Sequence, residues 1–453
     1  MSRFTAVISR RLALHGLAAS ILAPALTLPA RAQAGATTIL SVADLHSAYG
    51  RLPQLLTAIR AEAANASDLL IVLNGDIFEL ANPVATRSRG EADLAFLRAI
   101  AKLGPVIVNL GNHEPDFVPD KADIVSMMDE AGVTVISNIL DARTGNPYAP
   151  ATTRVRLAGR EITAVGIATD NLFTYPEAIR PQLAIPAPVD YAQATLAGLG
   201  DAPLVLLSHA GLVADRAILP ILPAGSVVIG GHDHLTLTNE AASVYVHGGA
   251  WGRTLTRLDV SDGGGELTVS PRRIDVAMDA EGDRDLAVLI GRLEDQHLRE
   301  EDRAVVGTSP RALDLRESIL FAVEAVREAA DADLALLGHT TFGASLLAGP
   351  VRRYDFDAFV RFDGEIVVAE VDGATLRGIL ARANQFEAAS LDERTGDYVH
   401  AADIEIDEVA TYRLATNGWT ATNQERYLGT RALMFEPVRA LTLKTAVIDA
   451  LSK

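Results

Sequence analysis

Residues 69–76 read Leu-Leu-Ile-Val-Leu-Asn-Gly-Asp, five apolar residues followed at once by a polar turn and an acid. A short continuous apolar run is typical of a strand that is buried on both faces of a sheet. Gly75 allows a sharp turn directly after such a strand, and Asp76 then stands at the carboxyl end. The segment therefore predicts a buried strand that delivers a carboxylate to the edge of a sheet.

Further apolar runs of the same kind occur on both sides of this segment. The runs that we expect to form buried strands are Thr38–Ala43, Leu69–Leu73, Pro105–Leu110, Thr134–Ser137, Ile162–Gly166, Leu204–Ser208 and Ser226–Ile229. Amphipathic segments between some of them predict helices at Arg51–Ala64, Glu91–Leu103 and Ala122–Ala131. Strands that alternate with helices indicate an α/β sandwich in which helices cover a central sheet.

The pattern changes near residue 246, and the change divides the chain. Strands with glycine turns are expected near Val246–Val260, and Asp283–Glu301 reads as one charged amphipathic helix. A second α/β region follows that helix. We therefore predict an export signal at residues 1–34, a first domain at 35–280, a helical linker at 281–304 and a second domain at 305–453.

The composition excludes several function classes. The 453 residues include 58 acidic and 40 basic side chains, which gives a formal net charge of −18. An acidic surface argues against binding to duplex nucleic acid or to an anionic membrane, because both need a basic face. The chain has no Cys, which excludes disulfides, thiolate nucleophiles and Cys-based metal clusters. Any metal must be held by His, Asp, Glu or Asn.

Residues 1–34 have the three parts of an export signal. Arg3, Arg10 and Arg11 precede an apolar stretch at Leu12–Leu28, and small residues end the segment. Ser9–Leu14 resembles the twin-arginine signal, and a Sec signal with two chance arginines is the alternative. The apolar stretch is interrupted by polar and helix-breaking residues, so we expect export to the periplasm without stable membrane insertion.

Polar motifs stand where five of the predicted strands end. They are Asp44-Leu45-His46, Asn74-Gly75-Asp76, Gly111-Asn112-His113-Glu114, Ser208-His209-Ala210 and Gly230-Gly231-His232-Asp233-His234. Ligands of open α/β sheets bind at the carboxyl ends of the strands, so we expect the five motifs to converge. Imidazole and carboxylate suit zinc, manganese, iron or cobalt, and a carboxylate can bridge two cations. The motifs therefore predict two divalent metal ions without distinguishing the element.

This series of motifs resembles the calcineurin-like metallophosphoesterases. The second domain makes the chain similar to the bacterial 5′-nucleotidase family, which includes UDP-sugar hydrolases. The resemblance implies a four-layer α/β/β/α sandwich followed by a smaller C-terminal α/β domain for substrate recognition. It also implies a set of metal ligands: Asp44, His46 and His234 on one ion, Asn112, His209 and His232 on the other, and Asp76 bridging both.

The same resemblance implies roles for two residues that do not bind metal. His113 would stabilise charge on the phosphoryl group or the leaving oxygen, and Asp116 would orient His113. The nucleophile would be a metal-bound hydroxide, because two cations can lower the pKa of water to roughly 7. No side-chain nucleophile is then needed, which agrees with the absence of Cys.

In the second domain, the resemblance implies that Phe362 and Trp419 clamp a base between two rings. Each ring would fit equally well in a core or a domain interface. The arginines that hold the phosphate in the family are not found at the matching positions. Gly343 stands at one of these positions, and Arg311 and Arg316 flank the others. A site without planar bidentate donors binds nucleotide phosphate less well.

Three functions remain open on this basis. The leading hypothesis is an exported two-metal phosphoesterase that acts on a nucleotide or another small-molecule phosphate ester. A relative similar to the thiosulfohydrolases of sulfur oxidation would instead release sulfate from a carrier protein. A metal-loaded binding protein without turnover is disfavoured, because His113 and Asp116 are both present and neither is needed to hold metal.

Overall fold

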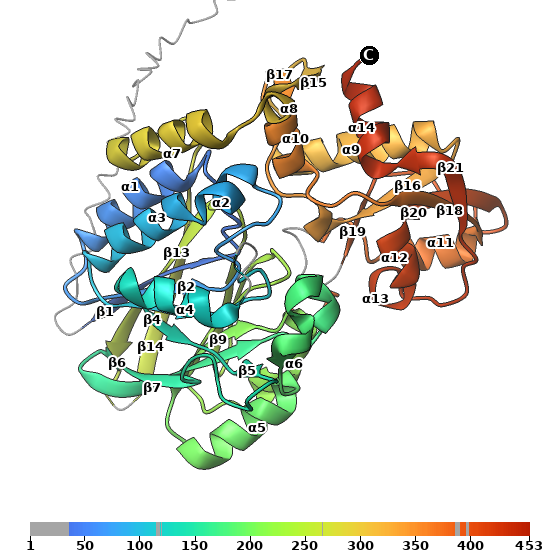
Figure 1. Cartoon of the computed structure of the whole chain (residues 1–453). Helices are drawn as coiled ribbons and strands as arrows, with labels where there is room; N and C mark the ends of the chain where they lie inside the picture. The colour runs from blue at the N-terminus through green and yellow to red at the C-terminus, as the bar shows by residue number, and fades with distance from the viewer. Residues whose placement is uncertain (1–35, 115–117, 119, 265, 386–389, 396–397) are drawn as a thin grey trace, which may run out of the picture.

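The computed structural model describes residues 36–114, 118, 120–264, 266–385, 390–395 and 398–453. The predicted export signal at residues 1–34 and the predicted catalytic residue Asp116 lie outside this part of the chain. Figure 1 shows two α/β domains, the first coloured from blue to yellow and the second from orange to red. Among the described residues, none of the helices has the length and apolar character that a membrane crossing requires.

The first domain is built on two six-stranded sheets. The first sheet has the order β14-β13-β1-β2-β3-β4, and its strands are β1 (Thr37–Ala43), β2 (Leu69–Asn74), β3 (Val106–Asn109), β4 (Thr134–Ile136), β13 (Thr254–Asp262) and β14 (Leu267–Asp275). The second has the order β11-β12-β10-β9-β7-β6, with β6 (Thr152–Leu157), β7 (Arg160–Ala168), β9 (Leu204–His209), β10 (Val227–Gly230), β11 (Thr236–Glu240) and β12 (Val244–Gly248). The neighbouring strands β1 to β4 run parallel, as do β7, β9, β10 and β12.

The two sheets pack face to face, and helices cover their outer faces. Ile39, Val72 and Ile107 of the first sheet share an apolar core with Val205 and Ile229 of the second. The helices on the outer face of the first sheet are α1 (Leu52–Ala63), α3 (Glu91–Ala101) and α4 (Lys121–Glu130), and those on the second are α5 (Pro188–Leu199) and α6 (Leu212–Ile218). This order confirms the predicted four-layer α/β/β/α sandwich.

Every strand and helix that we predicted from residues 38–229 is present, with ends shifted by no more than two residues. The expectation of a single central sheet was wrong, because the buried runs divide between two sheets. Alternation of strands and helices indicates that the strands are buried, but it does not tell which strands pair. The resemblance to a known family gave the layer order correctly.

The predicted single helix at Asp283–Glu301 is two helices. The first is α7 (Arg284–His297), and after an extended residue at Leu298 the chain forms α8 (Glu300–Arg303). Ile290 and Leu293 of α7 are buried in the core that also contains α1 and α3. The helix α7 is therefore part of the outer helical layer of the first domain.

The second domain is a five-stranded sheet covered on both faces. The sheet has the order β19-β16-β20-β18-β21, with β16 (Leu334–Gly338), β18 (Glu365–Asp372), β19 (Val399–Ala401), β20 (Thr411–Asn417) and β21 (Glu436–Thr442). One face packs against α9 (Leu315–Ala329), α10 (Arg353–Phe359) and α14 (Leu443–Leu451), and the other against α11 (Gly373–Leu380) and α13 (Gln424–Leu428). This architecture confirms the predicted second α/β domain.

A buried acid supports the loop that follows β1. Asp93, in α3, is almost fully buried, and the Tyr49 hydroxyl donates a hydrogen bond of 2.6 Å to its Oδ2. Burial raises the pKa of Asp93 to about 7, and the hydrogen bond from Tyr49 opposes this shift. Folding therefore favours the protonated acid, because the ordinary pKa of an unfolded Asp is about 3.9.

We expect Asp93→Asn to become more stable relative to the wild type as the pH rises from about 4 to about 7. Below about pH 4 the acid is protonated in both states, whereas above about pH 7 the folded wild type carries the full cost of a buried carboxylate. The amide oxygen still accepts from Tyr49. Melting temperatures of both proteins at about pH 4.5, 6 and 8 measure the effect. A difference that does not change with pH would contradict it.

Candidate metal centre

The five sequence motifs meet at one edge of the first domain. Three follow β1, β2 and β3 of the first sheet, and two lie at the ends of β9 and β10 of the second. Asp44, His46, Asp76, His232 and His234 all have positive φ, between 50° and 77°. This conformation costs a residue with a side chain of the order of 1–3 kcal/mol and is concentrated at functional sites.

Two groups of three side chains are each compact enough to hold one ion. Within each group, the candidate ligand atoms lie within 4.8 Å of one another, and the groups are Asp44–His46–His234 and Asp76–His209–His232. Asp76 connects them, because its Oδ2 lies 3.2 Å from Nε2 of His209 and 3.8 Å from Nε2 of His46. A carboxylate between two such groups is placed as a bridge between two cations requires.

The buried polar atoms of the site pair poorly with one another and are placed to bind cations. The Nε2 atoms of His46 and His234 lie 3.0 Å apart. Oδ2 of Asp44 is buried and has no hydrogen-bond partner in the described part of the chain. Nδ1 of His209 donates to the carbonyl of Asn74 at 2.8 Å, which leaves its Nε2 facing Asp76. Imidazoles fixed in this way, together with carboxylates, suit divalent metal ions.

Asn112 belongs with the second group. Its Oδ1 lies 2.8 Å from Nδ1 of His232, and its amide nitrogen donates to the carbonyl of Thr174 at 3.0 Å. The amide nitrogen is thus used outside the group, and the oxygen faces the imidazole. This orientation matches the ligand role that the resemblance gives to Asn112.

The two carboxylates of the site have opposite electrostatic environments. Burial raises the pKa of Asp44 to about 8. Burial also acts to raise the pKa of Asp76, but the nearby imidazoles of His209 and His113 hold it well below its usual range. Burial lowers the pKa of His209, and Asp76 outweighs this effect and raises it to about 10. Protein charges alone therefore compensate Asp76 and leave Asp44 uncompensated, as expected for a site that takes cations.

Glu114, the last residue of the third motif, joins the turns of the site. Its carboxylate accepts from the backbone N–H groups of Gly111 at 2.7 Å and of Asp76 at 3.2 Å. Lys121 is buried below it and donates to the carbonyls of Glu114 and Gly111. The sequence motif contained this glutamate. Its role in joining two turns becomes visible only in the structure, where the turn after β2 lies against the turn after β3.

His113 lies beside the metal groups. Its ring centre is 4.9 Å from that of His46, and its backbone N–H donates to Oδ1 of Asp76 at 2.8 Å. Its side chain is partly exposed, whereas the His46 side chain is buried. The predicted partner Asp116 lies outside the described residues, so the pairing of the two stays a prediction.

The two predicted base-binding rings are half exposed. Phe362 and Trp419 each have 46% of their surface exposed, which contradicts a core position for either. The ring centre of Phe362 lies 6.5 Å from that of His113, so this ring borders the metal centre. Trp419 lies in α12 (Gly418–Thr422), and its Nε1 donates to the hydroxyl of Tyr427 at 3.2 Å.

The structure explains the glycine at position 343. A Cβ on Gly343 would lie 2.2 Å from Cζ2 of Trp251, so the indole fills the space of any side chain there. Arg311 is exposed and pairs with Glu317 at 2.9 Å, and Arg316 is exposed as well. These positions supply no arginine to the metal centre.

Another arginine of the second domain does reach the metal groups. Arg361 follows α10, and its buried guanidinium donates to Oε2 of Glu79 from Nε at 2.9 Å and from Nη2 at 2.5 Å. The same Nη2 lies 3.0 Å from Nδ1 of His46. We assigned no role to Glu79 from the sequence. The available signal was an acid three residues after Asp76 in an otherwise apolar loop.

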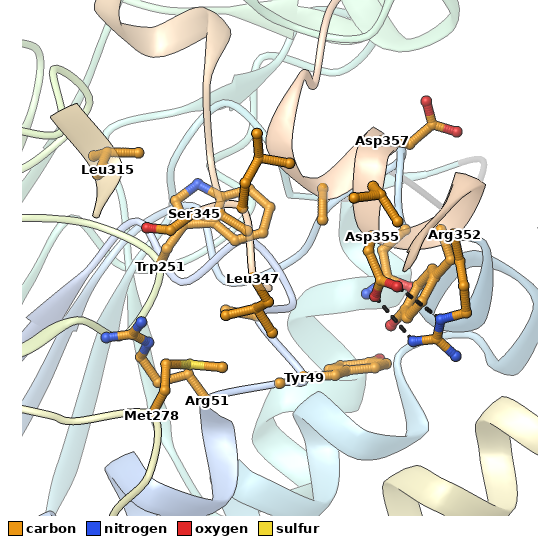
Figure 2. A pocket seen from close by; sticks show the side chains of 18 of the residues that line it. Tyr49, Arg51, Trp251, Met278, Leu315, Ser345, Leu347, Arg352, Asp355 and Asp357 are labelled. Atoms are coloured by element: carbon orange, nitrogen blue, oxygen red, sulfur yellow. Dashed lines mark hydrogen bonds and ion pairs between the residues drawn. The ribbon is translucent and has the colours of Figure 1, made fainter. Parts of the chain in front are cut away.

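A cavity of about 650 Å³ lies between the two domains, next to the metal centre. Figure 2 shows Tyr49 of the first domain and Leu347 of the second among its lining side chains. Glu79 and Trp251 also line it. Both contact His46, Glu79 through its carboxylate at 3.2 Å and Trp251 through ring centres 5.7 Å apart. These two side chains therefore stand between the cavity and a metal-site histidine.

Two protein-family models match the chain. Residues 37–235 match the calcineurin-like phosphoesterase model, and residues 305–430 match the 5′-nucleotidase C-terminal domain. A comparison with curated protein sequences finds no match.

Several solved structures resemble the whole chain. The 5′-nucleotidase precursor from Thermus thermophilus is 18% identical, with 92% of this chain and 96% of that chain covered and a TM-score of 0.57. The sulfate thiohydrolase SoxB from the same organism is 16% identical, with 92% and 93% covered and a TM-score of 0.62. The Candida albicans 5′-nucleotidase is 13% identical, with 92% and 98% covered and a TM-score of 0.57. At these identities the similarity shows a shared fold across both domains.

The four-layer sandwich and the His and Asp groups at its edge define a metal-dependent hydrolase. The chain belongs to the calcineurin-like phosphoesterases that carry a 5′-nucleotidase C-terminal domain. The family resemblance stated from the sequence is thereby confirmed. The assignment of each ligand to an ion stays a prediction.

We expect Asp76→Asn to bind fewer than two metal ions per chain and to lose activity. The substitution removes the negative charge that both ions would share, so both sites weaken together. Elemental analysis of the dialysed protein measures the metal content, and Asp201→Asn, which alters an exposed acid, is the matched control. Full metal content in Asp76→Asn would overturn the bridging assignment.

Proposed function

We propose that the chain is an exported two-metal phosphoesterase that hydrolyses small-molecule phosphate esters, namely nucleotides or related phosphomonoesters. The observation that carries this proposal is the position of Asp76, with its carboxylate 3.2 Å from His209 and 3.8 Å from His46. Two divalent ions, when bound, supply Lewis acidity and a reactive water at neutral pH. Export to the periplasm by the twin-arginine route is part of the proposal and rests on residues 1–34 alone.

Contacts with the backbone hold several of the proposed ligands in position. The proposed ligands are Asp44, His46 and His234 for one ion, Asn112, His209 and His232 for the other, and Asp76 for both. Six of the seven side chains lie on turns that follow strands, His209 is the last residue of β9, and most are fully buried. A rigid, water-excluded ligand set strengthens electrostatic interactions and limits reorganisation during the reaction.

His113 is proposed to stabilise the charge that develops on the phosphoryl group or the leaving oxygen. It stands beside His46 and is partly exposed, as His232 is, so it can face a substrate. Its backbone N–H is fixed by Asp76, which ties its position to the proposed bridge. Asp116 is proposed to orient its ring, three residues further along the chain.

Phe362 and Trp419 are proposed to stack on a flat ring of the substrate. Both rings are half exposed, and Phe362 borders His113. Stacking of a base on an aromatic side chain contributes about 1–3 kcal/mol. Because Gly343 leaves no room for a side chain, a phosphate tail gains no bidentate donor at that position. We therefore propose that nucleotides are not strongly preferred over simple phosphate esters.

A second candidate function is the release of sulfate, as in the thiosulfohydrolases of sulfur oxidation. The observation that favours it is again Gly343, because the indole of Trp251 occupies the space of the missing arginine. Similarity to the sulfate thiohydrolase from Thermus thermophilus agrees with this candidate at the level of fold.

We expect His113→Ala to lower kcat by about 10²–10⁴-fold while both metal ions stay bound. The imidazole would act on the transition state, so its loss should leave the ligand set intact. Single-substrate kinetics and elemental analysis on the same preparation measure the two effects. His297→Ala, which removes a histidine from α7, is the control. Loss of one ion from His113→Ala would make it a ligand and would contradict the proposed role.

We expect the metal-reconstituted protein to show similar kcat/KM values for simple aryl phosphates and for nucleoside monophosphates. The values are measured for a nucleotide panel, an aryl phosphate and an organic thiosulfonate, on wild type and on Trp419→Ala. A large preference for one nucleotide that Trp419→Ala abolishes would show that the phosphate tail is held after all. Turnover of the thiosulfonate alone would establish the second candidate.

A further inference from the structure

A side chain of the second domain occupies a third group of potential metal ligands. His46, Glu79 and His113 also offer ligand atoms within 4.8 Å of one another. Nη2 of Arg361 lies 2.5 Å from Oε2 of Glu79, 3.0 Å from Nδ1 of His46 and 3.5 Å from Nε2 of His113. In this third group, the guanidinium of Arg361 therefore occupies the place that a metal ion would take.

Arg361 is held tightly in this place. Its Nη1 donates to the carbonyl of Thr340 at 3.2 Å, and its guanidinium carbon lies 4.8 Å from the ring centre of Phe362 and 5.7 Å from that of Trp251. The side chains of Arg361 and Glu79 are 2% and 3% exposed. The ion pair is thus buried, and it joins the second domain to the loop that follows β2 in the first.

Nδ1 of His46 has two neighbours that favour opposite tautomers of the imidazole. Oε2 of Glu79, at 3.2 Å, can only accept a hydrogen bond from it, whereas Nη2 of Arg361, at 3.0 Å, can only donate one to it. When Nδ1 carries the proton, it donates to Glu79 and Nε2 keeps the lone pair that a metal needs. When Nδ1 accepts from Arg361, the proton of the neutral imidazole stands on Nε2 and blocks it.

We propose that Glu79 is the positioning residue that selects the metal-binding tautomer of His46, and that Arg361 is the counter-ion that holds Glu79 in place. This inference rests on the proposed two-metal site. Carboxylate partners generally fix the tautomer and ring orientation of metal-binding histidines. Here the counter-ion comes from the other domain. The placement of the second domain thereby governs one of the two metal sites.

Glu79→Gln removes the negative charge of Glu79 and keeps the shape of the side chain. With the carboxylate gone, either the new amide N–H or Arg361 donates to Nδ1 of His46, which fixes the tautomer with a blocked Nε2. We expect the affinity of the ion at His46 to fall by about 10–100-fold, while the ion at His209 keeps its wild-type affinity. Chelator competition on the metal-free protein, titrated with zinc or manganese, measures both affinities without any turnover.

The double variant Glu79→Gln/Arg361→Met tests the role of the cation. Without Arg361, the glutamine can turn its carbonyl oxygen toward Nδ1 of His46, so the metal-binding tautomer becomes available again. We expect the affinity at His46 to recover by about tenfold over Glu79→Gln. Imidazole ¹⁵N chemical shifts of the metal-free protein report the tautomer directly. They should show Nδ1 protonated in the wild type and the double variant, and Nε2 protonated in Glu79→Gln.

Arg352→Met is the matched control, because Arg352 pairs with Asp355 at 2.7 Å within the second domain and should leave both affinities unchanged. Thermal melting establishes whether each variant is folded. If Glu79→Gln does not fold, the double variant still tests the inference, because it buries no unpaired charge. Wild-type affinity in Glu79→Gln, or a double variant that stays as weak, overturns the inference. A wild type that binds two ions but hydrolyses no phosphate ester refutes the proposed function alone.

Discussion

Asp76 joins turns from all parts of the metal centre. Its Oδ1 accepts from the backbone of His113, its Oδ2 faces His209, and its own carbonyl accepts from the backbone N–H of His46 at 2.9 Å. Turns from both sheets therefore meet on one buried carboxylate. A Cβ on Gly111 would lie 2.2 Å from Oδ1 of Asp76. The turn after β3 therefore needs glycine at position 111 for Asp76 to lie against it. The face-to-face packing of the two sheets is what brings these turns within reach.

Local patterns in the sequence predict the first domain well, because strand and turn identity there depends on neighbours along the chain. The run Leu69–Leu73 and the turn after it can be predicted from their own residues alone. The pairing of strands cannot, since two sheets and one sheet use the same apolar runs. The pair of Glu79 and Arg361 is harder still, because 282 positions separate the two residues and their contact depends on how the domains dock.

Trp251 changes what the second domain can contribute. Its ring centre lies 5.7 Å from that of His46 with an interplanar angle of 24°, and its edge fills the space beside Gly343. One aromatic residue of the first domain thus replaces a cationic side chain of the second. The site has an apolar wall where a planar donor would stand, and under the proposed function this favours a flat or compact substrate over one with a charged tail. The sequence shows the missing arginine, but only the structure shows what took its place.

The interface between the domains combines a buried ion pair with a cavity of about 650 Å³. A buried ion pair contributes little net stability, because desolvation of both charges offsets their attraction. A cavity likewise removes packing contacts that would otherwise hold two surfaces together. Directional contacts such as the Glu79–Arg361 pair therefore add to the apolar packing of Trp251 against Ala344 and Ala358 in placing the second domain next to the metal centre. Such contacts hold their geometry only when both partners are present, so the docking of the second domain and the state of His46 are linked through Glu79.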